Sequence, residues 1–65
     1  MKTVYLTFII EDYQYPDFQT AHATLESATS YVEKELIDST CVKINDYTYK
    51  GASFRVAIVE KEILD

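Results

Sequence analysis

The chain has one histidine and one cysteine, His22 and Cys41, the residue types most often used in acid–base and nucleophilic catalysis. A catalytic His22 would need a nucleophile or a carboxylate held beside it. Asp17 and Glu26 are near in sequence, but nothing fixes their geometry. Cys41 follows a predicted helix end, with Asp38 nearby, which is not the cationic setting that activates a thiol. We therefore expect no catalytic residue and no enzyme.

Cofactor and metal patterns are also missing from the sequence. One cysteine and one histidine cannot form a Cys/His zinc site. A single glycine excludes a glycine-rich phosphate loop. The pair Glu11–Asp12 offers too few oxygens for a divalent cation without further ligands, and no Asp-x-Asp-x-Asp-Gly loop exists. We expect neither a cofactor nor a metal.

Aromatic residues form two clusters along the chain, which contains six Tyr and three Phe. Tyrosine is enriched at protein interfaces because its ring offers a wide apolar contact and its hydroxyl a polar one. Binding is therefore the chemistry that these residues predict. The first candidate binding cluster is Tyr13, Tyr15 and Phe18, and the second is Tyr47, Tyr49, Lys50 and Arg55.

The second cluster also combines aromatic rings with positive charges. The run from Lys50 to Val56 faintly resembles the RNA-recognition submotif, in which a basic residue and Gly precede spaced aromatics on a strand. Ala52 and Ala57 stand where the submotif needs aromatic rings. The hairpin is therefore a candidate for weak nucleic-acid or nucleotide stacking, with an ordinary cross-strand aromatic pairing as the simpler interpretation.

The net charge is −5, from eleven Asp and Glu against six Lys and Arg. An acidic chain disfavours sequence-independent nucleic-acid binding and adsorption to anionic membranes. The apolar start of the chain is interrupted by threonines and is too short to span a bilayer. A lone thiol suits a reducing compartment. We expect a cytoplasmic protein with no membrane association.

Hydrophobic periodicity predicts three strands and one helix in a single domain, 1–65. The strands are expected at residues 3–10, 41–49 and 54–60, with a bulge or a turn at Asn45–Asp46, and residues 11–23 are expected to form a connector. The helix is expected to begin at Thr24, or one turn earlier at Thr20, and to end near Ile37. Its apolar stripe is Leu25, Ala28, Val32 and Leu36.

These elements predict an α+β fold, a small β-α-β-β domain with a three-stranded, mainly antiparallel sheet and one helix on one face. The strand order is expected to be 1-3-2 or 3-1-2. The helix is expected to cover Val4, Leu6, Phe8, Val42, Ile44, Phe54, Val56 and Ile58. The face left open is expected to carry Tyr5, Thr7, Ile9, Ala57 and Val59. An open apolar face predicts a partner, and a homodimer is favoured.

Together these features favour a non-enzymatic protein-binding module. Its tiny, acidic and tyrosine-rich composition is similar to that of small proteins encoded by phages and other mobile elements. The missing catalytic set, the acidic charge and the aromatic clusters favour an inhibitor or regulator of a larger bacterial or phage assembly. The alternatives are an oligomer that binds a small ligand or nucleotide at Tyr47, Tyr49, Lys50 and Arg55, and a weak nucleic-acid-binding hairpin.

Overall fold

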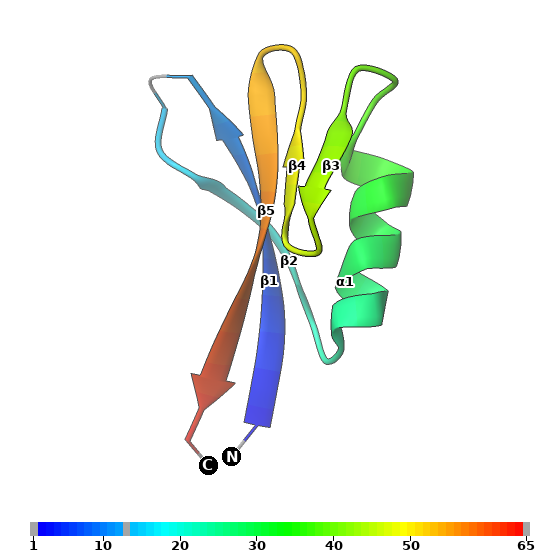
Figure 1. The fold of residues 1–65 in the computed structure, drawn as a ribbon. Helices are drawn as coiled ribbons and strands as arrows, with labels where there is room; N and C mark the ends of the chain where they lie inside the picture. The colour runs from blue at the N-terminus through cyan, green and yellow to red at the C-terminus, as the bar shows by residue number, and fades with distance from the viewer. Residues whose placement is uncertain (1, 13, 65) are drawn as a thin grey trace.

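The computed structural model describes residues 2–12 and 14–64, which form a five-stranded antiparallel sheet and one helical segment (Figure 1). The sheet order is β2-β1-β5-β4-β3. The expected three-stranded sheet is therefore wrong, although the α+β class holds. The elements are β1 (Lys2–Glu11), β2 (Asp17–His22), α1 (Leu25–Tyr31), the π-helical turn η1 (Val32–Leu36), β3 (Val42–Asn45), β4 (Thr48–Lys50) and β5 (Phe54–Ile63).

Strand β2 lies within the expected connector, residues 11–23. It pairs with β1, and a bulge interrupts the register: Thr7 lies opposite Thr20, whereas Phe8 lies opposite Phe18, which leaves Gln19 as the extra residue. A bulge breaks the two-residue alternation that identifies a strand in a sequence. Phe18 and Ala21 consequently share a face although three positions separate them.

The expected second strand is two strands, because Asn45–Asp46 forms a turn rather than a bulge in one strand. The Asn45 side-chain oxygen accepts a hydrogen bond from the Tyr47 amide at 2.8 Å, as in an Asx turn. Strand β3 returns along β4, and β4 pairs with β5. The order β1-β5-β4 corresponds to the expected 1-3-2 arrangement.

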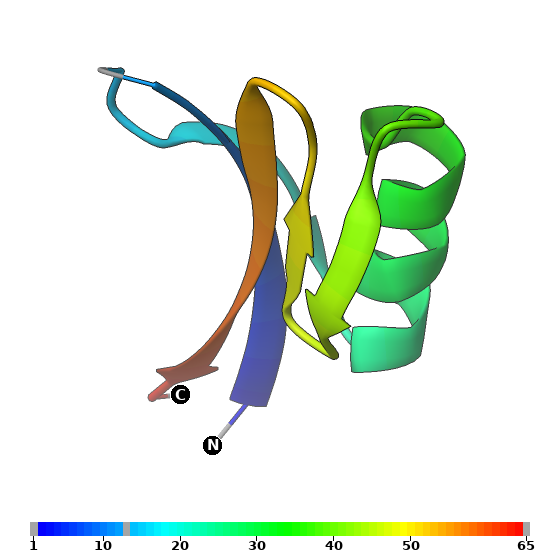
Figure 2. The ribbon, with the colours of Figure 1, turned by 45° about the horizontal axis from the view of Figure 1, so that its top comes forward.

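Strand β5 continues through Ile63, where the sequence suggested a charged tail. It pairs with β1 over ten consecutive positions, from Lys2 opposite Ile63 to Glu11 opposite Phe54. The β2 and β4 pairings stop at Tyr5 and Ala57, so the first residues of β1 and the last of β5 continue as a two-stranded ribbon. Both chain ends lie at the tip of this ribbon (Figures 1 and 2).

The helix begins at Thr24, as the first of the two alternatives predicted. The Thr24 backbone is extended, and its hydroxyl accepts a hydrogen bond from the Ser27 amide at 3.1 Å. After Tyr31 the helix widens into η1, whose last bond runs from the Ile37 amide to the Val32 carbonyl at 3.1 Å. The helical segment packs on one side of the sheet (Figure 2).

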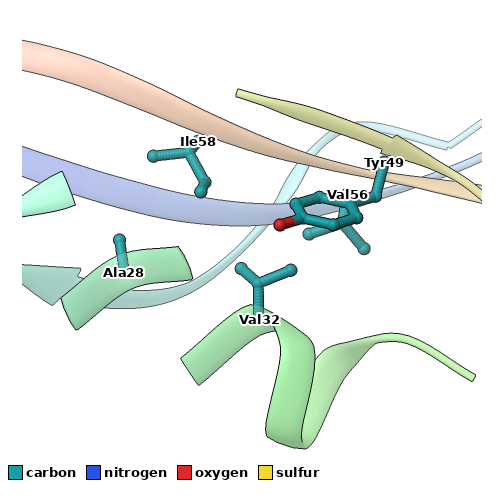
Figure 3. Packing of buried hydrophobic residues seen from close by; sticks show 5 residues of the cluster. All are labelled: Ala28, Val32, Tyr49, Val56 and Ile58. Carbon is teal, nitrogen blue, oxygen red and sulfur yellow. The ribbon is translucent and has the colours of Figure 1, made fainter. Parts of the chain in front are cut away.

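The core lies between the helical segment and the sheet (Figure 3). Its buried members are Ala28 and Val32 from the helix side and Tyr49, Val56 and Ile58 from the sheet. The predicted apolar stripe is confirmed, because Leu25 and Leu36 pack against the same cluster.

The expected orientation of β1 is wrong. Tyr5 and Ile9 pack on the core cluster, and Thr7 lies directly opposite the buried Ile58. Residues opposite each other on antiparallel strands share a face. Thr7 and Ile9 therefore face the helix with Ile58 and Val56, and Leu6 and Phe8 face away from it with Val59 and Ala57.

The two faces of β5 can be separated by matched substitutions. Val56 is fully buried, so Val56→Ala removes core contacts and leaves a cavity, at a cost of about 2 kcal/mol in the free energy of unfolding. Val59 is 44% exposed on the opposite face, so Val59→Ala is expected to cost less than about 1 kcal/mol. Urea unfolding measures both values. Equal losses would contradict the assignment of faces.

Candidate functional site

The face of the sheet turned away from α1, here called the helix-free face, is largely apolar. Strand pairing places Val4, Leu6, Phe8 and Ile10 of β1 on it. Their neighbours there are Ala57 and Val59 of β5 and Phe18 of β2. These seven residues form the apolar strip. Phe18 and Val59 are 52% and 44% exposed, which is unusual for large apolar side chains grouped on one face.

The helix-free face also carries most of the positive charge of the chain. Lys61 lies opposite Val4, and Lys2 lies opposite Ile63. Arg55 lies opposite Ile10 and also opposite Lys50 of β4. Four of the six Lys and Arg residues therefore surround the apolar strip, two near each end. Among residues 2–12 and 14–64, the one ion pair joins Lys43 to Asp46 on the other side of the sheet.

The carboxylates of the described strands lie on the opposite face. Glu60 and Asp17 are paired with Tyr5 and Ile9, and Glu11 with Phe54, all of which pack against the core. Glu62, two residues after Glu60, shares its face. A chain with a net charge of −5 thus has one basic face. At the border of this face, in the loop after β1, Asp12 lines a hollow of about 390 Å³ together with Lys50 and Arg55.

Two phenylalanines shape the middle of the apolar strip. The rings of Phe8 and Phe18 meet edge to face, with centroids 5.7 Å apart and planes at 69°. Beside them is a shallow hollow of about 220 Å³, lined by Phe8, Ile10, Pro16, Ala57 and Val59. The surface of the strip is therefore hollowed as well as apolar.

Of the first predicted binding cluster, only Phe18 belongs to the apolar strip. Tyr15 lies in the loop between β1 and β2 and is 94% exposed. Tyr13 lies outside the described residues. Phe18 is held on the strip by the β2 bulge.

The second predicted cluster is divided by the sheet. Tyr49 is 2% exposed and packs in the core, where its hydroxyl donates a hydrogen bond to Glu33 at 2.8 Å. Burial, reinforced by that bond, raises the pKa of Tyr49 to about 12. Lys50 and Arg55 lie on the helix-free face, and Tyr47 lies at the β3–β4 turn. The four residues do not form one pocket.

Sequence reasoning did not find the site residues of β1 or the two cations near Val4, at the start of that strand. Leu6 and Phe8 are expected under the helix, and Lys2 and Lys61 are not among the predicted site residues. The signal that separates the two faces is the charge on β5, where Arg55 and Lys61 flank Ala57 and Val59 on one face. The Glu60 side chain is on the other face, where it accepts a hydrogen bond from the Tyr5 hydroxyl at 3.0 Å.

A second polar cluster lies on the helix side, where a chain of hydrogen bonds connects β1, β2 and α1. Thr7, which is fully buried, is 2.7 Å from Thr20 between their hydroxyl oxygens. The Thr20 hydroxyl is 2.8 Å from His22 Nε2, and His22 Nδ1 is 2.9 Å from the Ser27 hydroxyl. The His22 ring also packs against Tyr31, with centroids 5.4 Å apart.

Two arrangements of the protons satisfy this hydrogen-bond chain. In one, the Thr20 hydroxyl donates to Thr7 and accepts from His22 Nε2–H, and His22 Nδ1 accepts from the Ser27 hydroxyl. In the other, the Thr7 hydroxyl donates to Thr20, the Thr20 hydroxyl donates to His22 Nε2, and His22 Nδ1–H donates to Ser27. The 2.9 Å between His22 Nδ1 and the Ser27 hydroxyl suits a nucleophile and its base in the first arrangement.

Two features favour a structural role for this chain of hydrogen bonds. The Ser27 and Ala28 amides, which an oxyanion would need, are already donated to Thr24. A threonine hydroxyl rather than a carboxylate supports the imidazole. The hydrogen-bond chain therefore fastens α1 to the sheet.

Other candidate chemistry is sparse in the described residues. Cys41 is partly buried against Gly51, and its thiol donates a long hydrogen bond to Asp38 at 3.6 Å. The described residues contain no group of three or more His, Cys, Asp or Glu side chains arranged to hold a metal ion. None of the helices formed by those residues is long and apolar enough to cross a membrane.

The buried end of the hydrogen-bond chain can be tested with isosteric substitutions. Thr7→Val leaves the Thr20 amide, which donates to the Thr7 hydroxyl at 3.0 Å, without its partner. We expect a loss of about 1–3 kcal/mol in the free energy of unfolding. Thr3→Val is the matched control on the same face of β1, with an expected effect below about 0.5 kcal/mol. Equal urea midpoints for the two variants would refute the structural role of the hydrogen-bond chain.

No protein-family model matches this chain, and no curated protein or solved structure matches it significantly.

Proposed function

We propose that this protein is a non-enzymatic protein-binding module whose contact surface is the helix-free face. The observation that carries the proposal is the apolar strip, seven apolar side chains on one continuous sheet face that α1 does not cover. A grouped apolar surface of this kind, rimmed by charge, is typical of a protein interaction site.

The chemistry of the strip favours a protein over a small ligand. Five of its seven side chains are aliphatic, and its two rings, those of Phe8 and Phe18, are already in contact with each other. The hollow beside them is shallow and small compared with the pockets of about 300–1,000 Å³ that enclose drug-sized ligands. The four residues of the nucleotide alternative are divided between the two faces, because Tyr49 packs in the core whereas Lys50 and Arg55 lie on the helix-free face.

A domain of this size can act by binding to a larger protein. Occupation of a partner's surface would make it an inhibitor or regulator of a larger assembly, of bacterial or phage origin. The apolar strip, rather than the exposed Tyr15, is the surface that we assign to this role.

A homodimer, which the sequence analysis favours, stays a prediction and competes for the same face. The charge distribution weighs against self-association there. Because cations lie at both ends of the strip, either direction of packing sets cations against cations. A foreign partner avoids this repulsion.

Capture experiments with two double variants test the proposal. Phe18→Ser/Val59→Ser removes two half-exposed members of the strip, and Tyr15→Ser/Tyr47→Ser removes two exposed rings outside it. Proteins captured by the unmodified chain from a lysate of its source cell should be lost with the first variant and kept with the second. Circular dichroism verifies that both variants fold.

The opposite pattern, loss with the tyrosine variant alone, would overturn the assignment of the binding face. Equal capture by all three folded proteins would do the same. Sedimentation velocity of the unmodified chain, run alongside, shows whether a second copy already occupies the strip.

A further inference from the structure

We propose that the partner segment is an acidic amphipathic α-helix that lies along β1 on the helix-free face. This inference rests on the proposed function and adds the chemistry of the partner. Three observations carry it: the length of the apolar strip, the cations at its two ends and the mostly aliphatic composition of its seven side chains.

The apolar strip has the dimensions of one helix. From Val4 to Ile10 the strand advances about 20 Å, at roughly 3.4 Å per residue. A helix of about 14 residues has the same length. The strip is three strands wide, from Phe18 on β2 across β1 to Val59 on β5, about 10 Å between the outer strands and close to the diameter of a helix. On the other face, the helical segment packs against the sheet (Figure 2).

Positive charge marks both ends of this helix-sized strip. Lys2 and Lys61 lie at the end near Val4, and Lys50 and Arg55 lie at the end near Ile10. None of the four is in an ion pair within the part of the chain that the structure describes. A helix with acidic residues near both ends and an apolar stripe between them would pair with all four.

The charge on this face is notable because the chain as a whole is acidic. The strand carboxylates face the helix side, and Glu26, Glu33 and Glu35 lie on the helical segment itself. A basic partner would therefore be attracted to the helix side, whereas an acidic partner is attracted to the helix-free face. Only the second surface also offers apolar area.

The same face is poorly suited to single-stranded nucleic acid. Stacking needs free aromatic faces. Here the two rings of the strip engage each other edge to face, and Val4, Leu6, Ile10 and Val59 are aliphatic.

A binding assay with defined probes tests the inference. The probes are a fluorescent helical peptide of about 14 residues with a leucine stripe and glutamates elsewhere, and the same peptide with lysines in place of the glutamates. Oligothymidylate and phosphatidylglycerol vesicles represent other anionic ligands. Fluorescence anisotropy and vesicle co-sedimentation are recorded from roughly 20 to 500 mM salt.

The protein variants are matched in charge. Arg55→Glu/Lys61→Glu reverses one cation at each end of the strip, and Lys34→Glu/Lys43→Glu reverses two cations elsewhere. We expect the unmodified chain to prefer the glutamate peptide by at least about 10-fold and to lose this preference as salt rises. The first variant should prefer the lysine peptide, and the second should still prefer the glutamate peptide.

Three results would overturn the inference. Equal binding of the two peptides would show that charge does not select the partner. Equal loss in both variants would show an effect of net charge rather than of this face. Binding of oligothymidylate or vesicles, with no binding of the glutamate peptide, would assign the face to another anionic ligand. If lysate capture still depends on Phe18 and Val59 in any of these cases, the protein-binding proposal stands and only the acidic-helix inference fails.

Discussion

The ten-residue pairing of β1 with β5 determines the rest of this structure. Because opposite residues of an antiparallel pair share a face, this one register places Thr7 and Ile9 with Ile58 and Val56 under α1. It places Leu6 and Phe8 with Val59 and Ala57 on the other side. A shift by one residue would exchange the two faces of β1 relative to β5. The core, the buried hydroxyl of Thr7 and the exposed apolar strip therefore have a common origin.

The same register separates charge. Along β5, Arg55 and Lys61 lie on the helix-free face, and Glu60 and Glu62 lie on the other. An acidic protein thereby acquires a basic surface on the face where the apolar strip is uncovered. The sum of charges over the sequence indicates solubility, whereas the distribution over the two faces indicates a partner.

Much of the fold could be predicted from the sequence, and the failures have identifiable causes. The stripe on the helix agrees with the structure, as does one of the two alternatives for the helix start, Thr24, and one of the two for the strand order, 1-3-2. Strand β2 was missed because a bulge at Gln19 breaks its alternation. The orientation of β1 was wrong because both of its faces are largely apolar, so hydrophobicity alone favoured Leu6 and Phe8 for the core. Phe18, Lys50 and Arg55 were identified as site residues, but only the register shows that they lie on one face.

The proposed function requires that the apolar strip is open to solvent while its neighbours on β5 are buried. Solvent paramagnetic relaxation of methyl resonances, measured with a soluble gadolinium chelate, tests this most directly. Val59 is 44% exposed and Val56 is fully buried, three residues away on the same strand. We expect strong relaxation of the Val59 methyls and protection of those of Val56 and Ile58. Protected Val59 methyls beside strongly relaxed Val56 methyls would contradict it.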